Sequence, residues 1–109
     1  MKETESQIVS AICDYLAYHK DLFFFRLNNI PVWTENRFRA LPKYTPRGLP
    51  DILCCLKGQF IGLEVKRKGQ KLRPEQVAIG QAIKKAGGLY YMVRSIDEVK
   101  DILTDIGDG

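Results

Sequence analysis

The stretch Gly48–Lys66, with the sequence GLPDILCCLKGQFIGLEVK, decides the fold of this chain. It holds two short apolar runs, ILCCL and FIGLEV, separated by Lys57-Gly58, and glycine accepts a positive φ angle without steric cost. The pattern predicts a β-hairpin. Three charges stand out, because buried strands are normally built from Val, Ile and Leu. Asp51 begins the first run, and Glu64 and Lys66 lie in the second.

A two-residue loop at Lys57-Gly58 sets the register of this hairpin. Cross-strand partners then have residue numbers that add to 115, so Asp51 faces Glu64, and Lys66 lies on the same face. The Cβ atoms of facing residues lie about 4.5 to 5.5 Å apart. Two carboxylates at that spacing need a shared proton or a shared cation, and their hard oxygen atoms favour Mg²⁺ or Mn²⁺. The alternative is a salt bridge of Lys66 with the acids in an ordinary sheet, which burial makes costly.

Length and composition indicate one globular domain, residues 1–109, with an ordinary balance of 45% hydrophobic and 28% charged residues. The net charge of +4 is compatible with a polyanionic partner. No apolar run approaches the roughly 18 residues of a membrane span, and no signal sequence is recognisable. The three cysteines include no C-x-x-C pair, so we expect reduced, buried thiols in a cytoplasmic protein without membrane association.

The rest of the chain predicts an α/β fold in which a central mixed sheet is flanked by helices. Its order is helix, strand, hairpin, helix, strand, helix. The expected elements are a helix over 4–19, a strand over 22–27 inside the sheet, a helix from Pro74 that Gly87-Gly88 ends, a strand over 89–94 and a helix from Ser95.

Two polar residues lie at the predicted helix starts. Glu5 falls in the first turn of the first helix, on the side of its apolar residues. It either complements the helix dipole or points inward to the hairpin carboxylates. Gln76 falls in the first turn of the helix that begins at Pro74, beside the strand that carries Glu64; the alternative is a solvated surface amide.

Residues 28–50 show no regular pattern, and a connection of that length in a compact domain is usually functional or disordered. Basic side chains here would contact phosphates while aromatic ones stack on bases, or the aromatic ones would pin the loop to the core. The expected DNA-contacting residues of this segment are Trp33, Arg37, Arg39, Lys43, Tyr44 and Arg47. A second basic cluster follows the hairpin from Lys66 to Lys71, and we expect its Arg67 and Lys68 to contact DNA as well.

The pair Pro50-Asp51 followed by Glu64-Val65-Lys66 resembles the motif of the PD-(D/E)xK nuclease superfamily, whose core is restriction-endonuclease-like. Asn28, the Gly48-Leu49-Pro50-Asp51-Ile52 segment and Pro74-Glu75-Gln76 look like the virus-type replication-repair nuclease family, VRR-NUC. The resemblance covers nearly the whole chain.

That resemblance implies metal-dependent, structure-selective cleavage of branched DNA, such as Holliday junctions or flaps, by a homodimer in phage or bacterial replication, recombination or repair. Asp51 and Glu64 would be metal ligands, joined by the carbonyl of Val65. Lys66 would be the motif lysine, Gln76 the glutamine of the following helix and Glu5 the first-helix glutamate. The competing interpretations are a basic nucleic-acid-binding module with an inactive metal site and a sequence-specific, restriction-like nuclease.

Overall fold

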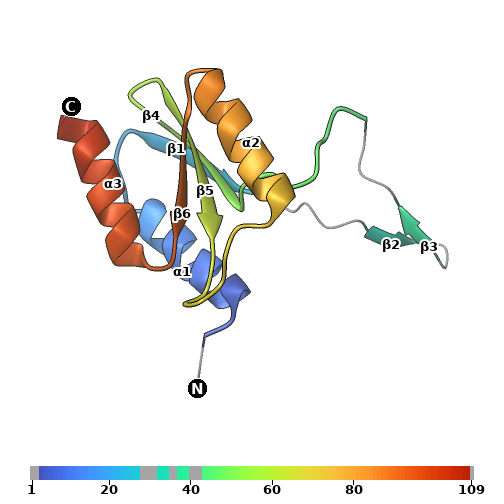
Figure 1. Ribbon diagram of the computed structural model, residues 1–109. Helices are drawn as coiled ribbons and strands as arrows, with labels where there is room; N and C mark the ends of the chain where they lie inside the picture. Colours follow the sequence, from blue (N-terminus) through green and yellow to red (C-terminus); the bar gives the residue numbers. More distant parts are fainter. Residues whose placement is uncertain (1–2, 28–31, 35–36, 40–42, 109) are drawn as a thin grey trace.

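The computed structural model describes residues 3–27, 32–34, 37–39 and 43–108. Three helices and six strands follow one another in the described chain (Figure 1). Their order and bounds are α1 Glu5–Leu16, β1 Leu22–Arg26, β2 Val32–Thr34, β3 Arg37–Arg39, β4 Ile52–Leu56, β5 Gln59–Val65, α2 Pro74–Lys85, β6 Leu89–Val93 and α3 Ile96–Asp108. The predicted α/β class is therefore confirmed.

A four-stranded mixed sheet with the order β1-β4-β5-β6 forms the centre of the molecule. β4 pairs with β5 in the predicted register, from Ile52 opposite Leu63 to Leu56 opposite Gln59. Lys57 and Gly58 both have positive φ angles, 52° and 77°, as a tight hairpin turn of this twist requires. β5 then pairs in parallel with β6, so α2 is the crossover between two parallel strands.

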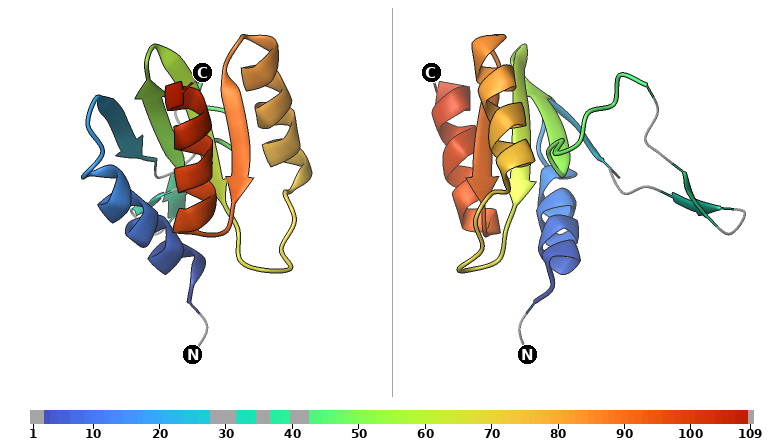
Figure 2. Two further views of the ribbon diagram at one scale, coloured as in Figure 1. Left: turned by 90° about the vertical axis from the view of Figure 1, so that its left-hand side faces the viewer. Right: turned by 45° about the vertical axis from the view of Figure 1, so that its right-hand side comes forward.

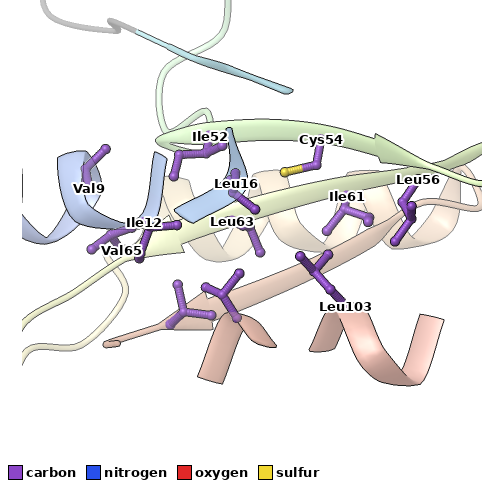
Figure 3. Packing of buried hydrophobic residues seen from close by; sticks show 12 residues of the cluster. Val9, Ile12, Leu16, Ile52, Cys54, Leu56, Ile61, Leu63, Val65 and Leu103 are labelled. Carbon is purple, nitrogen blue, oxygen red and sulfur yellow. The ribbon is translucent and has the colours of Figure 1, made fainter. Parts of the chain in front are cut away.

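The helices lie on both faces of the sheet (Figure 2). α1 and α3 share one face, where they enclose the main hydrophobic core with the inward side chains of β4, β5 and β6 (Figure 3). The alternation along β4 follows from this arrangement, because Ile52, Cys54 and Leu56 are buried in that core. α2 packs on the other face, mainly along β6.

β1 lies at the edge of the sheet, so the prediction of an interior strand was wrong. Phe23 and Phe25 are exposed, whereas Leu22 and Phe24 pack against the core. The run LFFFR is apolar on both faces, which is typical of an interior strand. In the described chain no helix covers the second face at β1, because α2 lies at the β6 side.

The segment between β1 and β4 contains a two-stranded ribbon that sequence reasoning missed. β2 and β3 pair antiparallel, with Trp33 opposite Phe38, and form a sheet of their own. Each strand has only three residues, which is too short for a recognisable alternation. Asn28 lies outside the described residues.

The cysteines are all free thiols, as expected. Cys54 is buried, but Cys55 is exposed because neighbouring strand residues point to opposite faces. The expectation of buried thiols was therefore wrong for Cys55. Within the described ranges, no helix is long and apolar enough to cross a bilayer.

Candidate active site

Two hydrogen bonds hold Asp51 at the start of the hairpin, one from β5 and one from the residue that follows β1. Its Oδ2 accepts from the backbone N–H of Val65 at 2.7 Å, and its carbonyl accepts from the N–H of Leu27 at 2.8 Å. Asp51 itself directly precedes β4. The backbone of β5 therefore orients this carboxylate.

Glu64 is the buried carboxylate of the site, with 2% of its surface exposed. It lies on β5, and its Oε2 accepts from Nε2 of Gln76 at 3.0 Å. Its Oε1 is buried and has no hydrogen-bond partner among the described residues. Burial, the charge of Asp51 and a side-chain hydrogen bond with Asp51 together raise the pKa of Glu64 to about 9, while the charge of Lys66 opposes the shift. An acid in this state holds a proton at neutral pH.

Glu5 brings a third carboxylate to the same place from α1. Ligand oxygens of Glu5, Asp51 and Glu64 all lie within 4.8 Å of one another. Of the two interpretations of Glu5, the structure therefore favours the inward one. Its charge also contributes to the raised pKa of Glu64. Three carboxylates at this spacing are a possible cation site, because each can turn an oxygen toward a shared centre.

Lys66 supplies the positive charge nearest to these acids. Its Nζ lies 4.0 Å from Oε2 of Glu64, and its side chain is almost completely buried. The backbone N–H of Lys66 donates to the carbonyl of Val93, so the pairing with β6 continues to the residue after β5. Even with Glu64 protonated, the ammonium of Lys66 offsets only one of the two remaining carboxylate charges of Glu5 and Asp51, so the cluster can accept additional positive charge.

Gln76 connects α2 to the carboxylates through both ends of its amide. Its Oε1 accepts from the N–H of Arg73 at 2.8 Å, and its Nε2 donates to Glu64. Because one end must accept and the other must donate, the amide has a single orientation. Gln76 therefore contacts the buried carboxylate of Glu64 and is not a solvated amide.

Gly48 anchors the start of α2 beside Asp51. Its φ angle is +85°, and a Cβ atom at this position would lie 2.6 Å from the carbonyl oxygen of Glu75. Glycine is required here because the backbone of the 43–50 segment presses directly on the first turn of α2. The same contact thus helps to position Gln76. The Gly-Leu-Pro-Asp stretch signalled a tight turn but not this contact.

Sequence reasoning missed Tyr90, an uncharged residue of β6 beneath α2. Its hydroxyl is buried and lacks a hydrogen-bond partner in the part of the chain that the structure describes. Burial raises the pKa of Tyr90, and the charges of Glu64 and Asp51 raise it as well. The sequence feature that could have indicated its position is a pair of glycines, Gly62 in β5 and Gly80 in α2. The missing side chains of these two glycines leave the space that the Tyr90 ring occupies.

The residues expected to contact DNA lie at several places. Lys43, Tyr44 and Arg47 are exposed, and Tyr44 is 89% exposed, so it does not pin the loop to the core. The Nζ of Lys43 lies 5.2 Å from the centre of the Tyr44 ring. Trp33 belongs to β2, and Arg37 and Arg39 belong to β3, which pairs antiparallel with β2.

Arg67 and Lys68 lie closer to the carboxylates, next to the start of α1. With Glu3 and Ile8 they line a hollow of about 380 Å³. Because Glu5 belongs to the same turn of α1, this basic pair flanks the acidic cluster on one side.

Comparison with known proteins supports the fold. No family model and no curated protein matches the sequence. One solved structure, named "VRR_NUC domain", covers 94% of this chain and 97% of its own, with a TM-score of 0.63 and 21% identity. Another, a "VRR_NUC domain protein", covers 95% of this chain and 88% of its own, with a TM-score of 0.67 and 15% identity.

The chain has the VRR_NUC fold. The likeness extends over nearly the whole chain, as the resemblance in the sequence implied, and at these identities it is a likeness of fold. On the VRR_NUC fold of this chain, the hairpin, α1 and α2 converge at Glu5, Asp51, Glu64 and Gln76.

Proposed function

We propose that this protein is a divalent-metal-dependent DNA endonuclease that hydrolyses phosphodiester bonds in branched DNA. The observation that carries the proposal is the convergence of Glu5, Asp51 and Glu64 within 4.8 Å, beside the buried ammonium of Lys66. Structures named for the VRR_NUC domain share the fold, which supports the same function.

The side chains of this cluster fit a hard divalent cation, Mg²⁺ or Mn²⁺. All three side chains offer carboxylate oxygens, and Oε1 of Glu64 is buried without a hydrogen-bond partner among the described residues. The carbonyl of Val65 is proposed as a further ligand. When bound, such an ion supplies a Lewis acid for a phosphate oxygen and makes water a stronger acid.

Each protein group has a separate task in this scheme. The Val65 N–H and the Gln76 amide hold Asp51 and Glu64 in place. The Lys66 ammonium compensates the negative charge that grows on the phosphate oxygens during attack by water. The burial of its side chain limits the movement of this ammonium, and the backbone of Lys66 is bound to Val93.

Branched DNA is the proposed substrate, and a homodimer the proposed assembly. Exposed basic and aromatic residues at Lys43, Tyr44 and Arg47 suit phosphates and unpaired bases near a branch point. Two symmetric copies would match the paired strands of a four-way junction. A role in phage or bacterial replication, recombination or repair, in the cytoplasm of the cell, is part of the same proposal.

Cleavage of a panel of DNA substrates tests this function. Linear duplex, flap, splayed-arm and four-way junction DNA of shared sequence should be compared in Mg²⁺, in Mn²⁺ and in EDTA. We expect cuts in branched substrates that need the divalent ion. Sedimentation of the protein with a junction should give two chains per junction. Cleavage of one linear sequence alone would contradict branch selectivity.

A nucleic-acid-binding module with an inactive metal site is the competing function, favoured by the net charge of +4. Asp51→Ala distinguishes the two. We expect this variant to bind the junction but not to cut it, while the unmodified protein does both. Binding by the unmodified protein without cleavage in any divalent ion would favour the binding module.

A further inference from the structure

Arg26 and two serines form a compact group on the edge of the molecule where α1 meets β1. The guanidinium donates from NH1 to Oγ of Ser10 at 3.1 Å and from NH2 to Oγ of Ser6 at 3.0 Å. The two serines are one helical turn apart and share a face of α1. Arg26 is the last residue of β1, and all three side chains are exposed.

This group is rich in hydrogen-bond donors and has no bound acid. A guanidinium has five N–H donors, and these bonds use two of them. Each serine oxygen accepts from Arg26, which leaves its own hydroxyl hydrogen for another acceptor. In the described ranges no carboxylate lies within 4.0 Å of Arg26, although Asp14 and Arg26 both influence the pKa of Cys13. Among the residues that the structure describes, the group is therefore a positively charged set of donors without an anionic partner.

The Arg26 group is connected through the backbone to two residues of the acidic cluster. Ser6 follows Glu5 in α1, and Leu27, the residue after Arg26, donates its N–H to the carbonyl of Asp51. Arg67 and Lys68 lie against Glu3 and Ile8 of the α1 region. The acidic cluster thus has basic groups at two different neighbouring places, the Arg26 group and the Arg67-Lys68 pair.

We propose that Arg26, Ser6 and Ser10 bind a backbone phosphate of the DNA strand that the acidic cluster cleaves. The inference rests on the proposed nuclease function and names a contact of that same site. A guanidinium fork and two hydroxyls match the several acceptor oxygens of a phosphate. Phosphate contacts of this kind fix the register of a strand without reading its sequence.

The test measures the affinity for a flap DNA in EDTA over a series of salt concentrations. Arg26→Gln should weaken binding about tenfold, as expected for loss of a charged hydrogen bond. The slope of log K against log salt should fall by roughly one, which is the effect of one lost phosphate contact. The Ser6→Ala/Ser10→Ala double variant keeps the charge and should weaken binding by a smaller factor. Lys85→Gln, at the far end of α2, removes one exposed charge as the matched control.

A structural role of Arg26 as a clasp between α1 and β1 gives a different result. The melting temperature would then fall, and Arg26→Gln would share the salt slope of the unmodified protein. Equal affinities and salt slopes for Arg26→Gln and Lys85→Gln would also contradict the phosphate site. The proposed nuclease function would still hold in that case if the unmodified protein cleaves DNA. A protein that neither binds nor cuts DNA would overturn both. Partial recovery of the slope in Arg26→Lys would support the phosphate contact.

Discussion

At the scale of single residues, Gln76 shows how one side chain can hold a site together. Its amide oxygen completes the first turn of α2 at Arg73, and its amide nitrogen fixes Glu64. One side chain thus couples the position of a helix to the orientation of a buried acid.

Gln76→Ala should lower cleavage activity about 10- to 100-fold, as is typical for residues that orient metal ligands. It should also cost about 1 kcal/mol of unfolding free energy, because a helix-end hydrogen bond is lost. Steady-state cleavage and chemical denaturation measure the two effects. Gln81→Ala is the matched control, since Gln81 lies exposed on the same helix. Equal activities of the two variants would contradict this role of Gln76.

The raised pKa of Glu64 makes stability without metal depend on pH. The folded protein keeps the proton up to about pH 9, while the unfolded chain releases it near pH 4.5. Stability is therefore greatest below pH 4.5 for this group and falls as pH rises toward 9.

Glu64→Gln should remove this pH dependence, because glutamine does not titrate. Between pH 6 and pH 9 in EDTA, the melting temperature of the unmodified protein should fall more than that of Glu64→Gln. Differential scanning calorimetry at several pH values measures the difference. Parallel curves for the two proteins would show that Glu64 is already ionised in the folded state.

At the scale of elements, the packing of α2 on the sheet depends on a glycine that a helix would not normally favour. A Cβ atom at Gly80 would lie 2.7 Å from Cδ1 of Tyr90. The ring of Tyr90 therefore occupies the space that a side chain at residue 80 would fill.

Gly80→Ala should destabilise the protein by about 1 to 2 kcal/mol, because overpacking against Tyr90 outweighs the gain in helix propensity. Gly107→Ala in α3 is the control, since a Cβ atom there meets nothing within 4 Å. It should be neutral or stabilise by about 0.5 kcal/mol. Unfolding in urea measures both. A stabilising Gly80→Ala would contradict the described contact with Tyr90.

The hairpin could be predicted to the residue, whereas the edge strand and the ribbon could not. A two-residue turn leaves one register, and the facing charges of Asp51 and Glu64 agree with it. The apolar run of β1 is typical of an interior strand, and its edge position could not be predicted because strand order depends on long-range packing. β2 and β3 are too short to show a period.

At the scale of the whole molecule, part of the candidate site could not be predicted from the sequence, because it depends on how α1 and α2 pack on the sheet. Glu5 was expected either to complement the helix dipole or to point inward to the hairpin carboxylates, and the docking of α1 beside β5 brings it to those carboxylates. Tyr90 and the Gly48 contact carry no charge pattern and depend on how α2 lies on the sheet. The acidic pair was predictable because both members belong to one local hairpin.

The measurement that tests the central claim most directly is cleavage of a labelled flap DNA as Mg²⁺ is added, by the unmodified protein and by Glu64→Gln. The carboxylate cluster predicts cleavage that rises to saturation with Mg²⁺ and stops in EDTA. Glu64→Gln should be slower by about 100-fold or more, since it loses a charged ligand. Equal cleavage by both proteins, or cleavage that persists in EDTA, would contradict the account.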